Sequence, residues 1–222
     1  MEGARWATFD CYGTLIDWNG GIGRELERLF GAESAARLLN RYHELEPQVQ
    51  HADSKQSYRE ILNRTLSRLA DAEGLRLPPE EGDALARSLP DWPAFPEVQR
   101  SLEQVRDRGW RLAILSNTDR DFIEASIRQI GVEFELAVVA GEIGSYKPAH
   151  GHWERFFEQS GAPKGGHVHV AASLFHDIAP AAELGLRSIW INRLGERARP
   201  APTRELEDLT GLADTLDELV PA

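Results

Sequence analysis

Cysteine and long apolar runs are both scarce in this chain, and each of these features excludes certain classes of protein. Cys11 is the single cysteine among 222 residues, so an internal disulfide and a multi-cysteine metal site are excluded. No run of about 18 apolar residues, the length that crosses a bilayer, occurs. No positively charged segment followed by an apolar one opens the sequence. We therefore expect a cytoplasmic protein with no membrane partner.

Positive charge is also in short supply. Lys and Arg number 25 against 36 Asp and Glu, which gives a formal net charge of −11. Binding to a nucleic acid requires a basic patch or stripe, so a nucleic-acid partner is not expected. A small anionic ligand is compatible with this charge, because one or two buried cations can set the local field. At 41% apolar and 27% charged residues, the composition is that of an ordinary globular protein.

Short apolar runs alternate with helical patterns through most of the chain. Strands are predicted at Ala4–Phe9, Arg111–Leu115, Leu136–Val139, His167–Ala172 and Ser188–Ile191, and helices at Glu97–Arg108, Asp119–Ile130, Ala149–Ser160 and Ile178–Leu184. This alternation is typical of the α/β class, in which a doubly wound parallel sheet carries helices on both faces.

The stretch from Asp17 to Trp92 breaks the alternation, because it has helical periodicity and no convincing strand. One predicted helix carries Leu38, Leu39, Tyr42 and Leu45 and weakens at Pro47. A second carries Tyr58, Ile61, Leu62, Leu66 and Leu69, with Asp53 and Gln56 spaced as a capping box. The Pro-rich segment Leu89–Pro96 is the expected return linker. These patterns predict a helical cap domain at 17–93, inserted into a core of residues 1–16 and 94–222.

Chemically useful side chains follow the predicted strands. Asp10 comes after the first strand, Ser116 and Asn117 after the second, Lys147 after the third and Asp177 just beyond the fourth. In a doubly wound sheet ligands bind at the carboxyl ends of the strands, so these groups are expected to share one site. Two carboxylates in one pocket need a cation between them, which Lys147 can supply.

Four ordered segments resemble the motifs of the haloacid dehalogenase superfamily. Phe9–Asp17 (FDCYGTLID) is similar to the first motif, Leu115–Asn117 (LSN) to the second, Tyr146–Pro148 (YKP) to the third and Ser173–Asp177 to the fourth. The resemblance implies a Rossmann-like core with a helical cap. It also implies that Asp10 is a nucleophile forming an ester that is later hydrolysed, assisted by Lys147 and Asp177.

Tyr12 points to one branch of that superfamily. Its phosphatases carry a second aspartate two residues after the nucleophile, whereas the branch of L-2-haloacid dehalogenases has tyrosine there. Halide leaves without a proton, so the missing acid is dispensable. A magnesium site, which needs several hard oxygen ligands, is weakened by the same change. We expect no metal and no cofactor.

Arg41 supports the same branch. It is predicted to lie on the helix face defined by Leu38, Tyr42 and Leu45 and, because a buried unpaired charge is costly, to meet an anion between cap and core. The resemblance implies that Arg41 receives the halide. The alternative is an arginine that reaches past its apolar neighbours into water.

The remaining candidate residues are expected to bind substrate. Backbone N–H groups after Asp10, with Ser116 and Asn117, are expected to hold a carboxylate, and the full predicted binding set is Cys11, Tyr12, Thr14, Ser116, Asn117, Trp153 and Ser173. Trp153 stands where the dehalogenases have an active-site tyrosine. Departures from their fourth motif at Ala172 and Leu174 place the substrate in question. His176 is interpreted as a satisfied surface histidine in preference to a base.

The leading hypothesis is a hydrolase acting on a small 2-substituted carboxylic acid, similar to (S)-2-haloacid dehalogenases. Two other hypotheses of enzyme activity stay open. One is an enzyme that opens another carbon–heteroatom bond, such as that of a strained ring carboxylate, and the other is a magnesium-dependent phosphatase of small molecules. A catalytically silent binding protein is the hypothesis from another class. The expected partner is a small carboxylate substrate, and association as a homodimer is left open.

Overall fold

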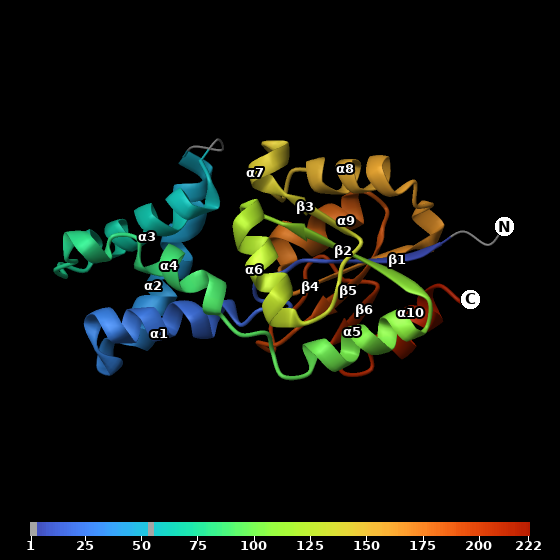
Figure 1. Cartoon of the computed structure of the whole chain (residues 1–222), viewed down its shortest axis with the longest axis horizontal. Helices are drawn as coiled ribbons and strands as arrows, with labels where there is room; N and C mark the ends of the chain where they lie inside the picture. Colours follow the sequence, from blue (N-terminus) through green and yellow to red (C-terminus); the bar gives the residue numbers. More distant parts are fainter. Residues whose placement is uncertain (1–3, 53–55) are drawn as a thin grey trace.

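The computed structural model describes residues 4–52 and 56–222. They form a core built on one six-stranded sheet and a helical domain at one end of it (Figure 1). None of the helices in these residues is long and apolar enough to cross a membrane.

All hydrogen-bonded neighbours in the sheet run parallel, in the order β3-β2-β1-β4-β5-β6. The strands are β1 (Arg5–Phe9), β2 (Trp110–Ser116), β3 (Leu136–Val139), β4 (His167–Ala171), β5 (Arg187–Ile191) and β6 (Arg204–Leu206). From β1 the chain builds outward to β2 and β3, then returns to place β4 on the other side of β1. The strand order therefore reverses beside β1, and such a switch point is where doubly wound sheets bind ligands.

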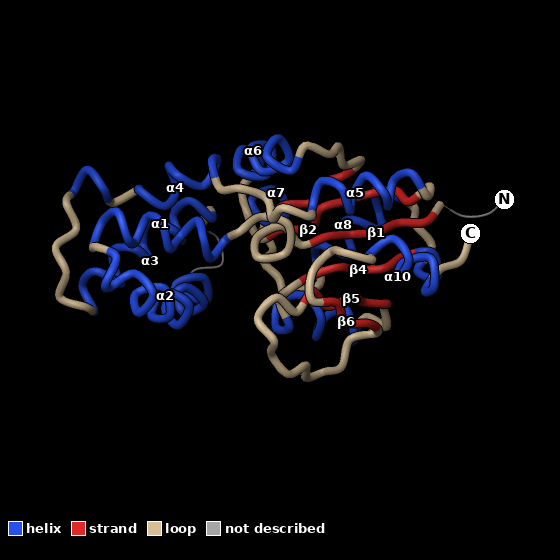
Figure 2. Tube along the Cα trace, turned by 90° about the horizontal axis from the view of Figure 1, so that it is seen from below, coloured by secondary structure: helices blue, strands red, loops and turns tan. Residues whose placement is uncertain are grey.

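Helices cover both faces of the sheet (Figures 1 and 2). One face packs on α5 (Val98–Asp107), α6 (Arg120–Ile130) and α10 (Leu212–Leu219), and this core includes Phe9, Ile114 and Val170. The other face packs on α8 (Gly151–Ser160) and α9 (Ala179–Glu183), with Trp6, Leu115 and Phe156 between the layers. Shorter segments are α7 (Ala140–Ile143), η3 (Lys164–Gly166) and the π-helical turn η4 (Leu174–Ile178). Burial on both faces explains why the strands are continuous apolar runs.

The cap consists of α1 (Trp18–Phe30), α2 (Ala32–Ala52), α3 (Tyr58–Ala72), η1 (Pro79–Glu81), α4 (Ala84–Ser88) and η2 (Leu89–Asp91). Its helices pack through an apolar stripe that includes Ile22, Leu38, Leu62 and Leu66. In Figure 2 the cap lies beyond one end of the strands and is separate from the layers that cover the sheet.

The two chain crossings between core and cap lie side by side. Ile16 and Ala94 form an antiparallel bridge. The Asp17 N–H donates to the Pro93 carbonyl at 2.9 Å, and the Phe95 N–H donates to the Leu15 carbonyl at 3.0 Å. This paired backbone supports a division of the chain at residues 16–17 and 93–94.

The doubly wound α/β fold expected from the sequence is confirmed, with some differences in its elements. β6 and α10 are additional elements that were not predicted from the sequence. Helix α2 continues through Pro47 to Ala52, since proline removes one hydrogen bond but tertiary packing keeps the helix in place. The capping box of α3 is formed by Ser57 and Glu60. The proposed box residue Asp53 lies outside the described residues.

Candidate active site

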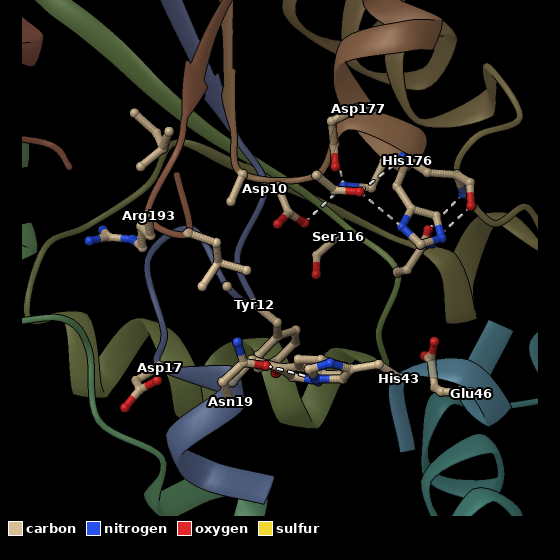
Figure 3. A pocket seen from close by; sticks show the side chains of 18 of the residues that line it. Asp10, Tyr12, Asp17, Asn19, His43, Glu46, Ser116, His176, Asp177 and Arg193 are labelled. Atoms are coloured by element: carbon tan, nitrogen blue, oxygen red, sulfur yellow. Dashed lines mark hydrogen bonds and ion pairs between the residues drawn. The ribbon is translucent and has the colours of Figure 1, made fainter. Parts of the chain in front are cut away.

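A cavity of about 550 Å³ lies between the carboxyl ends of the strands and the cap. Figure 3 shows Asp10, Ser116, His176 and Asp177 on its core side, with His43 and Glu46 across from them on the cap side. Of the site residues predicted from the sequence, seven line it: Asp10, Tyr12, Ser116, Asn117, Lys147, Ser173 and Asp177.

Lys147 joins the two carboxylates at the centre of the site. Its ammonium donates to Asp10 Oδ1 at 2.9 Å, to Asp177 Oδ1 at 2.7 Å and to the Leu115 carbonyl at 2.8 Å. All three donor positions of the ammonium are therefore occupied. Because Lys147 is 2% exposed, these interactions are little screened by water.

The environment separates the acid strengths of the two carboxyl groups. Burial raises the pKa of Asp10 above its ordinary value, and attraction to Lys147 offsets only part of the effect. Burial also opposes ionisation of Asp177, but Lys147 and His169 together hold its pKa well below the ordinary value. A carboxylate stripped of water, as Asp10 is, is a stronger nucleophile than a hydrated one.

A buried hydrogen-bonded chain orients Asp177 from behind. His169 Nε2 lies 2.9 Å from Asp177 Oδ1, and Thr8 Oγ1 lies 2.8 Å from both His169 Nδ1 and His167 Nε2. Burial lowers the pKa of His167 to about 3, so its ring is neutral. One assignment makes each contact a hydrogen bond: His167 donates to Thr8, Thr8 donates to His169, and His169 donates to Asp177. In the sequence, the sign of this hydrogen-bonded series is a pair of histidines two residues apart, His167 and His169, in β4.

Thr14 and Asn117 fix the positions of Asp10 and Lys147. The Thr14 hydroxyl donates to Asp10 Oδ2 at 2.9 Å and accepts from the Ala172 N–H. Thr14 is fully buried outside the pocket lining, so its hydroxyl orients the Asp10 carboxylate. The Asn117 amide exchanges two hydrogen bonds, of 3.0 and 2.7 Å, with the Lys147 backbone, so its polar atoms fix Lys147. The buried hydroxyl of Ser116 has no partner among the described residues and can serve a ligand.

A magnesium ion requires an octahedral shell of oxygen ligands, and three of the four carboxylate oxygens of Asp10 and Asp177 are already hydrogen-bonded to the protein. Both oxygens of Asp10 already accept hydrogen bonds from the protein, and Asp177 Oδ1 accepts two. Across the described ranges, no group of three His, Cys, Asp or Glu residues is arranged to hold a metal.

Besides Thr14, three predicted site residues lie outside the pocket lining. Arg41 is directed to the outer side of the cap, where it pairs with Glu44 and lies 3.7 Å from Glu73. Cys11 is fully buried in the core shared by sheet and cap. Trp153 packs edge-on against His169, with ring centroids 5.2 Å apart. The structure therefore does not bring the side chains of Arg41, Cys11 and Trp153 into the pocket lining, where the sequence placed them.

The cap contributes a polar group of residues that sequence reasoning missed. His43, Glu46 and Gln50 recur every three to four residues of α2 and line the pocket together with Pro47. Such spacing places side chains on one helix face. Trp18 also lines the cavity and stacks on His43.

His176 is interpreted from the sequence as a surface histidine, but the structure places it in the wall of the pocket. It follows Ser173 in η4, and its backbone N–H donates to Ser173 Oγ at 3.0 Å. The ring Nδ1 lies 3.2 Å from the same hydroxyl, and burial lowers the pKa of His176. Irregular π-helical turns of this kind are frequent at functional sites.

Comparisons with known proteins agree with this geometry. A family model for haloacid dehalogenase-like hydrolases matches residues 4–185. The chain belongs to this family of hydrolases. It is 25% identical to the (S)-2-haloacid dehalogenase 4A of Burkholderia cepacia, over 100% of this chain and 95% of that protein. It is 26% identical to the (S)-2-haloacid dehalogenase of Pseudomonas sp. strain YL, over 98% and 96%.

A solved structure extends the likeness to the fold. The L-2-haloacid dehalogenase from Xanthobacter autotrophicus with chloropropionic acid covalently bound superimposes with a TM-score of 0.86 at 16% identity. The match covers 99% of this chain and 100% of that one.

Proposed function

We propose that this hydrolase cleaves a carbon–heteroatom bond in a small 2-substituted carboxylic acid, as (S)-2-haloacid dehalogenases do, through an ester on Asp10. One observation carries the proposal: Lys147 holds the buried carboxylates of Asp10 and Asp177 at 2.9 and 2.7 Å in one pocket. A nucleophile and a base held by one cation can act in succession at the same carbon.

In the first step a carboxylate oxygen of Asp10 attacks the substituted carbon, and the leaving group departs with the bonding electron pair. Halide needs no proton, which suits the tyrosine at position 12. The Tyr12 hydroxyl forms a hydrogen bond with Ser126 Oγ at 3.0 Å, and Tyr12 lines the pocket. The Ser116 hydroxyl and the backbone N–H groups after Asp10 hold the substrate carboxylate in this proposal.

In the second step water attacks the carbonyl carbon of the Asp10 ester. Asp177 takes the proton, the ester bond breaks, and the product alcohol and free Asp10 carboxylate are released. Asp177 Oδ2 is buried without a partner among the described residues, so one acceptor is left for that water. Lys147 stabilises the negative charge that develops on the ester oxygen.

The covalent step is tested by a single turnover in heavy-oxygen water with enzyme in excess. The substrate panel consists of 2-haloacids and small ring carboxylates, with phosphate esters included and each reaction run with and without EDTA. We expect the label in Asp10, unlabelled product oxygen, and activity that survives the chelator. Asp177→Asn should accumulate an ester on the peptide that contains Asp10, detectable by intact mass.

Other outcomes would contradict this proposal. Label entering the product at the first turnover means that water attacks the substrate directly and that Asp10 is a general base. Hydrolysis of phosphate esters alone, lost with EDTA and restored by magnesium, assigns the chain to the phosphatase branch. Asp10→Asn is the negative control, and it should form no ester.

A further inference from the structure

The Glu46 carboxyl group lies in the cap wall of the pocket without a partner. Glu46 is 9% exposed, and its carboxylate points from the cap toward the core side of the cavity (Figure 3). Within residues 4–52 and 56–222, no group forms a hydrogen bond or an ion pair with it. A carboxylate this deeply buried is costly unless it is paired, so its placement calls for a ligand.

Lys147, Arg193 and His43 of the pocket cannot supply that partner, because each is already engaged. Lys147 uses its three protons within the core. The Arg193 guanidinium turns away from the pocket in Figure 3, where it meets Glu97 at 2.6 Å and lies 3.7 Å from the Phe95 ring centre. His43 lies 2.9 Å from Asn19 Oδ1, and burial lowers its pKa, so its ring is neutral.

The surroundings of Glu46 favour a cation. The pocket wall contains five carboxyl groups and two cationic groups, namely Asp10, Asp17, Glu46, Asp177 and Glu196 against Lys147 and Arg193. Rings of Trp18 and Tyr58 also line it, and aromatic faces attract cations. Pro47 has no N–H, so the His43 carbonyl lacks its usual partner four residues along the helix.

We propose that the cap side of this pocket binds a protonated amine with the Glu46 carboxylate as counter-ion, so that the substrate is a small zwitterion bearing both an ammonium and a carboxylate. The inference rests on the proposed function and deepens it, since it specifies the substrate class of the same site. It also gives a physical reason for the position of Arg41: a guanidinium in this wall would repel the ammonium and neutralise Glu46.

Proton uptake and release provide an independent signature. Burial raises the pKa of Glu46 to about 7, whereas an ammonium beside it favours the ionised form. At pH 7 about half of the empty sites therefore carry a proton, and ligand binding should release roughly half a proton. Other titratable groups near Glu46 are Tyr42, His43, Tyr58 and Tyr146. Burial raises the tyrosine pKa values and lowers that of His43, so these groups stay neutral at pH 7.

The test uses unreactive ligands that differ only in ammonium against methyl or methylene. Binding of 4-aminobutyrate is compared with that of pentanoate, and binding of proline with that of cyclopentanecarboxylate, by calorimetry in two buffers of different ionisation enthalpy. We expect the amine of each pair to bind about tenfold more tightly or better, because a buried charge pair replaces an unpaired charge. Glu46→Gln should remove both this preference and the proton release.

Glu44→Gln is the matched control on the same helix, because Glu44 is exposed, pairs with Arg41 and does not line the pocket. It should keep the preference. Equal affinities within both pairs, or a preference that survives Glu46→Gln in a protein of unchanged melting temperature, would overturn the inference.

The result is separable from that of the labelling experiment. If the wild-type protein shows no ammonium preference while label still enters Asp10, only the substrate class is rejected. A preserved preference with label entering the product rejects only the covalent mechanism.

Discussion

At the scale of single residues, His169 is the side chain whose effect on the reaction is most open to measurement. It does not line the pocket, but it donates to Asp177 Oδ1 at 2.9 Å and so positions the proposed base. A hydrogen bond to a charged group contributes about 1.5–3 kcal/mol.

His169→Phe removes that bond and keeps ring volume against Trp153. We expect kcat to fall by about ten- to a hundredfold, since this energy is lost from the second step. His169 helps to lower the pKa of Asp177, so the acidic limb of the kcat profile should move to higher pH. His169→Gln, which can donate again, should restore part of both.

His167→Phe is the control, because His167 contacts Thr8 and not Asp177. It should leave the acidic limb nearly in place. If His169→Phe lowers the melting temperature while kcat and the limb stay unchanged, the residue is structural only.

At the scale of secondary-structure elements, α3 of the cap is anchored by the core. The Asp119 carboxylate precedes α6 but does not cap that helix. It accepts instead from the backbone N–H groups of Tyr58 at 3.1 Å and Arg59 at 3.0 Å, in the first turn of α3. Unpaired N–H groups and a partial positive charge occur at this end of a helix, so the carboxylate is well matched to it.

Asp119→Ala should loosen the cap and raise KM several-fold, because both walls of the pocket are needed to hold substrate. Ser57→Ala is the comparison variant, since it removes the capping box of the same helix without touching the core. It should lower the free energy of unfolding by about 1 kcal/mol and leave KM unchanged. Steady-state kinetics and urea unfolding measure the two effects. An unchanged KM in Asp119→Ala would show that this contact does not hold the cap.

The arrangement of the secondary-structure elements also explains which parts of the site could be predicted from the sequence. Asp10, Ser116, Lys147 and Asp177 follow parallel strands, and topology alone brings strand ends together. The cap wall depends instead on how α2 is rotated, which composition and periodicity do not determine. Arg41 and His43 are two positions apart, or about 200° around a helix, so they lie on opposite faces, and choosing the wrong face of α2 places Arg41 in the pocket instead of His43.

Hydrogen bonding sets a second limit on what can be predicted about the site from the sequence. The motif residues Asn117 and Thr14 were correctly expected near Asp10, but their polar atoms bond to the protein and not to a ligand. Asn117 and its partner Lys147 lie in different motifs, and a motif gives the place of a side chain without its hydrogen-bond partners.

At the scale of the whole molecule, neutral buried histidines limit stability in acid. Burial, reinforced by Lys147, lowers the pKa of His152 to about 3, from an ordinary value of 6.5. His152 therefore binds a proton in the unfolded chain at a pH at which it stays neutral in the folded chain. The stability associated with His152 is fully present above pH 6.5 and is lost progressively as pH falls toward 3.

We expect wild type to lose stability faster than His152→Gln between pH 6.5 and 4.5, by about 1.4 kcal/mol per pH unit. The difference between the two proteins isolates this group, because Glu46 and Asp10, whose pKa values are raised, titrate in both. Urea unfolding at a series of pH values measures the slope. Parallel curves would show that His152 accepts a proton in the folded state.

The paired crossings at Ile16 and Ala94 have a consequence for how such a protein can diversify. Because the chain leaves and re-enters the core at adjacent backbone positions, the whole cap takes the place of a short turn between β1 and α5. Segments of different length can occupy that place without moving the ends of the strands. The proposed catalytic groups of the core and the pocket wall supplied by the cap are thus carried by separately replaceable parts, so the cap wall can change while the groups at the strand ends stay in place.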